Sequence, residues 1–149
     1  MRKICLLTFG VLSVAMFGCD RSESPSANEK VRRNGVTPAQ LTDANFQREV
    51  IESELPVLVD MWAPWCQPCI AMKPTIRELA AELSGEAKVA EVNIEENPFI
   101  KEKYNIDKYP MLLIFVDGKE AERLVGLKSK KYLNDALQVY MRDQTRAER

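Results

Sequence analysis

The stretch Trp62-Ala63-Pro64-Trp65-Cys66-Gln67-Pro68-Cys69 begins at the last residue of the apolar run 57–62 and precedes a helix-like pattern over residues 70–83. This order predicts a buried strand, a tight turn that carries Cys66, and a helix with Cys69 in its first turn. The backbone N–H groups at a helix start are unpaired and carry partial positive charge, so they stabilise a thiolate at Cys66. The spacing lets Cys66 attack a disulfide and lets Cys69 close a disulfide behind it.

The amino-acid composition argues against several other kinds of catalytic and metal site. The 149-residue chain has a net charge of -1 and no histidine, which excludes Cys–His and Ser–His catalysis and His-containing zinc sites. The other two cysteines, Cys5 and Cys19, lie near the N-terminus, so a four-cysteine zinc site is disfavoured and we expect neither a metal nor a cofactor. The densest basic patch, residues 128–131, is too short to predict a nucleic-acid groove.

The N-terminus reads as an export signal. A basic start is followed by the uncharged run 4–18, which would span only about 22 Å as a helix, against about 30 Å for a bilayer core. Met16-Phe17-Gly18-Cys19 looks like a lipoprotein cleavage site, although Met16 and Phe17 depart from the usual pattern. We therefore expect residues 1–18 to be removed and Cys19 to be lipidated; an uncleaved signal anchor or ordinary secretion stay as alternatives. Asp20 resembles the signal that keeps some lipoproteins in the inner membrane.

The rest of the chain divides by composition. Residues 19–39 are rich in polar residues and predict a flexible tether, residues 40–141 form one domain, and the charged tail 142–149 is expected to be disordered. Within the domain, Thr42-Asp43 is expected to cap a helix and Gly85 to end the helix that begins after the cysteines. Strands are predicted at 57–62, 87–94, 111–116 and 120–125, and a short helix is predicted after 97–98. A last helix is expected to be capped by Ser129. Its buried face is predicted to consist of Leu133, Leu137 and either Val139 or Tyr140.

The strand, the WCxPC motif and the helix resemble the thioredoxin family over roughly residues 41–141. The resemblance implies an α/β fold with a central mixed β-sheet flanked by helices on both faces. It also implies that Asp60, six residues before Cys66, is a buried proton acceptor and donor for Cys69. The expected catalytic residues are thus Cys66, Cys69 and Asp60, and a substrate groove with a cis-proline at Pro110 is implied at Trp65, Gln67, Pro68, Tyr109, Pro110 and Gly126.

Three residues depart from the family pattern. Gln67 replaces the usual glycine between the cysteines, Met111 stands where a threonine is usual, and Glu91 stands where a lysine near the buried aspartate is common. A carboxylate at Glu91 cannot offset the charge of Asp60, and two nearby carboxylates raise one another's pKa. We therefore expect Asp60 to stay protonated to a higher pH than in ordinary thioredoxins, and Met111 to change the shape of the groove.

The resemblance implies a monomeric thiol–disulfide oxidoreductase that acts on protein disulfides outside the cytoplasm, tethered to the membrane through Cys19. An exported reductant needs electrons from across the membrane, and the family's usual source is a membrane protein of the DsbD or CcdA type. The favoured role is that of a reductant or of support for an isomerase. An oxidising, disulfide-forming protein and a non-catalytic binding module are the alternatives. A permanent structural disulfide is the weakest one, because it would close a very small loop and add little stability.

Overall fold

The structure is a computed structural model that describes residues 35–147, with side chains as far as Arg142. The expected export signal 1–18, Cys19 and most of the expected tether lie outside the described residues. In chain order the elements are β1 (Ala39–Leu41), η1 (Gln47–Ile51), β2 (Val57–Trp62), α2 (Gln67–Glu82), β3 (Lys88–Asn93), α3 (Pro98–Lys103), β4 (Met111–Val116), β5 (Lys119–Val125) and α4 (Lys130–Ala147).

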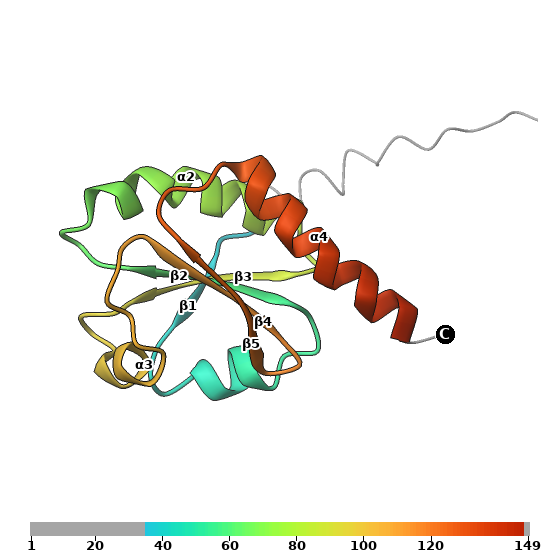
Figure 1. Ribbon diagram of the computed structural model, residues 1–149, viewed down its shortest axis with the longest axis horizontal. Helices are drawn as coiled ribbons and strands as arrows, with labels where there is room; N and C mark the ends of the chain where they lie inside the picture. Colours follow the sequence, from blue (N-terminus) through green and yellow to red (C-terminus); the bar gives the residue numbers. More distant parts are fainter. Residues whose placement is uncertain (1–34, 148–149) are drawn as a thin grey trace, which may run out of the picture.

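Strand β2 lies at the centre of a five-stranded sheet of order β1-β3-β2-β4-β5 (Figure 1). It pairs in parallel with β3 and antiparallel with β4, so the sheet is mixed, as expected. The first five residues of β2 are all buried. A strand with neighbours on both sides and helices on both faces needs such a continuous apolar run, which explains its central position.

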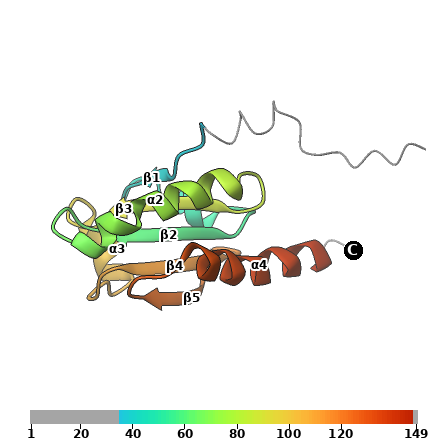
Figure 2. The same ribbon diagram turned by 90° about the horizontal axis from the view of Figure 1, so that it is seen from above.

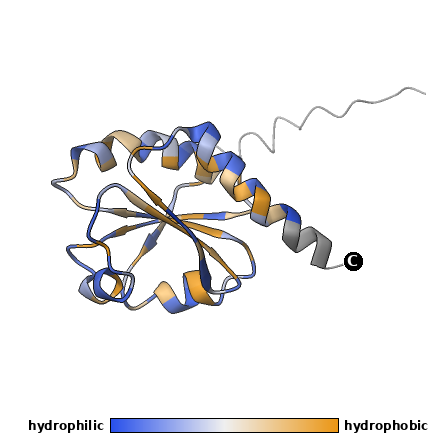
Figure 3. Ribbon diagram, viewed as in Figure 1, coloured by the Kyte–Doolittle hydropathy of each residue, from blue (hydrophilic) through white to orange (hydrophobic). Residues whose placement is uncertain are grey.

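Helices cover both faces of the sheet. Figures 1 and 2 show α2 and α4 on one face, and Figure 1 shows α3 and η1 on the other. Alternate residues of β2 accordingly enter two cores: Val57, Val59 and Met61 face η1 and α3, while Leu58 faces α2 and α4. Figure 3 shows hydrophobic colouring on the crossing strands and mixed colouring on α2 and α4.

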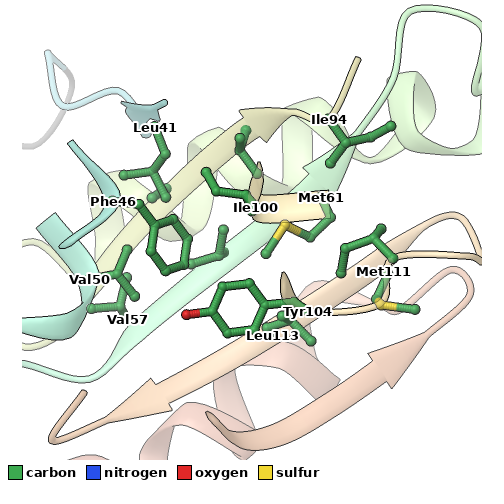
Figure 4. Close-up of a cluster of buried hydrophobic side chains, with 14 of the residues drawn as sticks. Leu41, Phe46, Val50, Val57, Met61, Ile94, Ile100, Tyr104, Met111 and Leu113 are labelled. Atoms are coloured by element: carbon green, nitrogen blue, oxygen red, sulfur yellow. The ribbon is translucent and has the colours of Figure 1, made fainter. Parts of the chain in front are cut away.

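The core on the η1 and α3 side is built around aromatic rings. The rings of Phe46, Tyr104 and Phe115 contact one another, with centroids 5.2 to 5.6 Å apart. Figure 4 shows Phe46 and Tyr104 among the surrounding aliphatic side chains. Aromatic pairs at such distances add stabilisation beyond the area that they bury. This core fixes the short elements η1 and α3 against the sheet.

Thr42-Asp43 is expected to cap the helix that follows it in the sequence, but Asp43 caps a different helix. The Asp43 carboxylate accepts hydrogen bonds from the backbone N–H groups of Phe99 and Ile100, at 3.1 and 3.0 Å, so it caps α3 rather than a helix of its own. Thr42 instead exchanges hydrogen bonds with Asn45 in a turn before the five-residue π-helical segment η1. Unpaired N–H groups at a helix start donate to any acceptor that the fold brings near, including one distant in sequence.

The last helix begins as predicted and ends later than predicted. The Ser129 hydroxyl accepts the N–H of Tyr132, and Leu133 and Leu137 are fully buried. Of the two alternatives, Val139 is 57% exposed and Tyr140 packs against the core. The helix continues to Ala147, so the expectation of disorder in the tail is wrong for residues 142–147; this segment has no glycine or proline to stop a helix.

Helix α2 differs from prediction at its C-terminal end. It ends at Glu82 with Leu83 as its cap, so Gly85 is not the cap; it lies in the following turn with φ of +88°. The helix runs through Pro74 without interruption. Within residues 35–147, no helix is both long enough and apolar enough to cross a membrane.

Candidate active site

Cys66 and Cys69 form a disulfide at the start of α2, with their Cα atoms 5.3 Å apart. The Cys66 N–H donates to the carbonyl of Ala63, which closes the tight turn after β2. Cys66 is the N-cap of α2, and its Sγ accepts the N–H of Cys69 at 3.2 Å. That N–H is one of the unpaired donors of the first turn, so it can stabilise negative charge on the Cys66 sulfur when the disulfide opens.

The residues around the disulfide present an exposed rim. Trp65, Gln67 and Pro68 are exposed, and Trp65 has 55% of its surface accessible. The Trp65 indole N–H donates to the Glu95 carboxylate at 2.6 Å, and its ring meets Tyr109 edge to face with centroids 5.0 Å apart. These two contacts hold a large apolar surface in place beside the disulfide.

The loop before β4 lies next to this rim. The Tyr109–Pro110 peptide bond is cis, as the resemblance implied. The carbonyl of Pro110 accepts the N–H of Gly126 at 2.8 Å, and Tyr109 contacts Trp65. Of the expected groove residues, the structure therefore links Trp65 to Tyr109 and Pro110 to Gly126.

Asp60 lies on β2, two residues before the last residue of the strand, and is fully buried. Neither carboxylate oxygen has a hydrogen-bond partner among the described residues. Burial raises the pKa of Asp60 from 3.8 to about 7; the charge of Lys73 lowers this pKa and the charge of Glu91 raises it. A carboxyl group that titrates near neutral pH can both take up and release a proton there, as general acid–base chemistry requires.

Lys73 is the residue that sequence reasoning missed. Its Nζ lies 2.9 Å from the Glu91 carboxylate and 3.6 Å from the centre of the Trp62 ring. Glu91 raises the pKa of Asp60, as expected, and Lys73 on α2 supplies a cation that lowers it. The sequence did hold a signal: Lys73 comes four residues after Cys69 and three before Ile76, which places it on the buried face of the helix.

No metal centre is found near the disulfide. Across the described part of the chain, no three His, Cys, Asp or Glu side chains are grouped so that they could hold a metal ion.

Comparisons with known proteins agree with this arrangement. The thioredoxin family model matches residues 37–139. Thioredoxin 1 of Synechococcus elongatus is 44% identical over 103 residues, which are 69% of this chain and 96% of that protein. Thioredoxin of Rickettsia felis is 45% identical over 95 residues, 64% of this chain and 90% of its own. Thioredoxin of Pyropia yezoensis is 42% identical over 106 residues, 71% of this chain and 99% of its own.

Proposed function

The chain belongs to the thioredoxin family and is a thiol–disulfide oxidoreductase, and from this premise we propose that it reduces protein disulfides outside the cytoplasm. Cys66 is the attacking thiolate, Cys69 the resolving thiol and Asp60 the proton acceptor. The observation that carries this proposal is the Cys66–Cys69 disulfide at the helix start, with the Cys66 sulfur already accepting a backbone N–H.

The first step opens the substrate disulfide. In the reduced protein, the Cys66 thiolate attacks one sulfur of the substrate, a mixed disulfide forms, and the other substrate sulfur leaves as a thiolate that takes a proton. The N–H of Cys69 stabilises the attacking thiolate and so favours its formation near neutral pH. Trp65, Tyr109 and the backbone around Pro110 provide the surface on which an extended substrate segment docks.

The second step releases the substrate. Cys69 gives its proton to the Asp60 carboxylate and attacks the Cys66 sulfur, which forms the Cys66–Cys69 disulfide and expels the second substrate thiolate. Two electrons have then moved from the protein to the substrate. Asp60 suits this step because its pKa of about 7 lets it accept the proton at neutral pH.

The location and the electron supply follow from the N-terminal sequence. The export signal 1–18 and a lipidated Cys19 would hold the domain at the outer side of the inner membrane. Disulfides persist in that oxidising compartment, so the protein must be reduced again after each turnover. A membrane protein of the DsbD or CcdA type is the electron donor that we propose, and the protein's substrates are exported proteins with disulfides.

Substitution of the two cysteines tests the order of attack. The soluble domain with Cys69→Ser is expected to form a stable mixed disulfide with a model protein such as reducible insulin, because the second step is blocked. Cys66→Ser is expected to form none and to reduce no insulin. Equal trapping by both variants, or faster trapping by Cys66→Ser, would contradict the assignment of Cys66 as the nucleophile.

The proposed anchor has its own test. Cells that express the full chain are fed a radioactive fatty acid and then fractionated. Label and membrane association are expected in the wild type and should both disappear with Cys19→Ser. A wild-type chain that carries no label, or that stays with the soluble fraction, would contradict the anchor without touching the chemistry of the disulfide.

A further inference from the structure

A small charged cluster lies behind the disulfide, between α2 and the sheet. Its cation is Lys73, whose side chain is only 15% exposed and whose Nζ lies 2.9 Å from the Glu91 carboxylate. The same ammonium group lies 3.6 Å from the centre of the Trp62 ring. A lysine held by both a carboxylate and an aromatic face has a fixed position, unlike the lysines of exposed ion pairs.

Glu91 is held from both sides. One carboxylate oxygen accepts from Lys73 on α2, and the other accepts the side-chain N–H of Gln40 on the edge strand β1 at 2.7 Å. Both carboxylate oxygens therefore have partners, and the side chain is 14% exposed. Glu91 thus holds the ammonium group of Lys73 in a fixed position between the helix and the sheet.

The cluster lies beside Asp60. Glu91 is the register partner of Asp60 in the pairing of β2 with β3, so the two side chains leave the same face of the sheet. On α2, the titratable or charged groups toward this face are Lys73 and the cysteine pair; on β4, the register partner of Asp60 is Leu112, which carries no charge. The pair Lys73 and Glu91 is thus the charged environment of Asp60 among the described residues.

We propose that Lys73 and Glu91 act as a positioning pair that sets the protonation state of Asp60 and, through it, the proton transfer with Cys69. This inference rests on the role proposed above for Asp60. The two charges act in opposite directions: the cation favours the carboxylate form of Asp60, and the anion favours the protonated form. Glu91 also holds the cation in place, so the pair works as one unit.

Substitutions of the pair are predicted to move the pKa of Asp60 in opposite directions. Lys73→Met removes the cation and leaves the negative charge of Glu91 uncompensated, so the pKa of Asp60 rises by about one unit. Glu91→Gln keeps the size of the side chain and an oxygen for Lys73 but removes the anion, so the pKa falls. The double variant is expected to lie between the two, and Lys73→Arg, which keeps the charge, close to the wild type.

The experiment follows the Asp60 side-chain carbon by NMR across a pH titration of the oxidised soluble domain. Asp60→Asn identifies the signal, and Lys130→Met is the matched control, because Lys130 pairs with Glu78 and Glu82 on the exposed side of α2. Opposite shifts for the two single variants support the proposal. An unmoved pKa, or shifts in the same direction, would overturn it, since a merely structural ion pair would change stability alone.

A second measurement links the titration to the reaction. The rate of insulin reduction is followed from pH 5.5 to pH 9, a range on either side of about 7, and its midpoint is expected to rise with Lys73→Met and to fall with Glu91→Gln. NMR shifts without matching shifts in the rate profile would overturn the catalytic half of the proposal. A wild-type domain that reduces no insulin would contradict the proposed function instead, and the titration of Asp60 would still decide whether the pair controls that carboxyl group.

Discussion

The burial of Asp60 lowers the stability of the fold and also raises the pKa of its carboxyl group. It is fully buried, and neither oxygen has a hydrogen-bond partner among the described residues. A buried carboxylate without partners is costly, and its pKa therefore rises. A carboxyl group that titrates near pH 7 suits the proposed exchange of a proton with Cys69.

The raised pKa of Asp60 predicts a pH-dependent stability. Below the ordinary pKa of 3.8, the folded and unfolded chains both hold the proton, so stability does not depend on the titration of Asp60. Between 3.8 and about 7, only the folded chain holds the proton, so stability falls as pH rises. Above about 7 the full cost, roughly 4 kcal/mol, is present. Asp60→Asn should therefore stabilise the oxidised domain strongly at pH 8 and less at pH 5, as measured by urea denaturation.

The control for this prediction is an exposed carboxylate. Glu86 lies in the exposed turn after α2, and Glu86→Gln should change the free energy of unfolding by the same small amount at both pH values. An Asp60→Asn variant whose gain in stability does not depend on pH would contradict the raised pKa.

Among the elements, the β4–β5 hairpin has a turn that also packs closely against η1. Asp117 and Gly118 both have positive φ, at 50° and 72°, as a two-residue hairpin turn needs. A Cβ atom at Gly118 would lie 2.5 Å from the carbonyl oxygen of Ile51 in η1. The sequence Asp-Gly predicts the turn, but only the fold shows that its glycine also makes room for η1.

Gly118→Ala is therefore predicted to cost more stability than Gly85→Ala. Both glycines have positive φ, but a Cβ atom at Gly85 would meet nothing within 4 Å. Gly85→Ala should lose about 1 kcal/mol from backbone strain. Gly118→Ala should lose a further 1–3 kcal/mol or so, because the backbone of η1 must move. Urea denaturation of the two variants measures the difference, and equal losses would contradict the close contact with Ile51.

Elements with a continuous or alternating apolar pattern were predictable from the sequence. The bounds of β2 and β4 agree with the predicted strands, because a buried strand has no polar face to blur its ends. The partner of Asp43 and the place of Lys73 could not be predicted in full, because each depends on an element distant in the chain. Val139 and Tyr140 are neighbours on a helix, so periodicity alone could not choose between them.

At the scale of the whole molecule, the disulfide and the start of the described chain lie at opposite ends of α2. Figures 1 and 2 show the turn between β2 and α2 at one end of the molecule and the first described residues toward the other. Val36 shares a cavity with Ser84 and Gly85, just beyond the C-terminal end of α2. A helix of 16 residues is about 24 Å long. The proposed tether would join the domain at that end and would leave the disulfide free to meet the proposed membrane donor or a soluble substrate.

The central claim is that the Cys66–Cys69 pair works as a reductant, and its reduction potential tests this most directly. The soluble domain is equilibrated in dithiothreitol or glutathione buffers of graded potential, and the fraction of disulfide is measured at each one. We predict a value near about −270 mV, where thioredoxin lies, which makes the pair a donor of electrons to substrate disulfides. A value near about −120 mV, where the oxidant DsbA lies, would contradict the account and make the protein a source of disulfides.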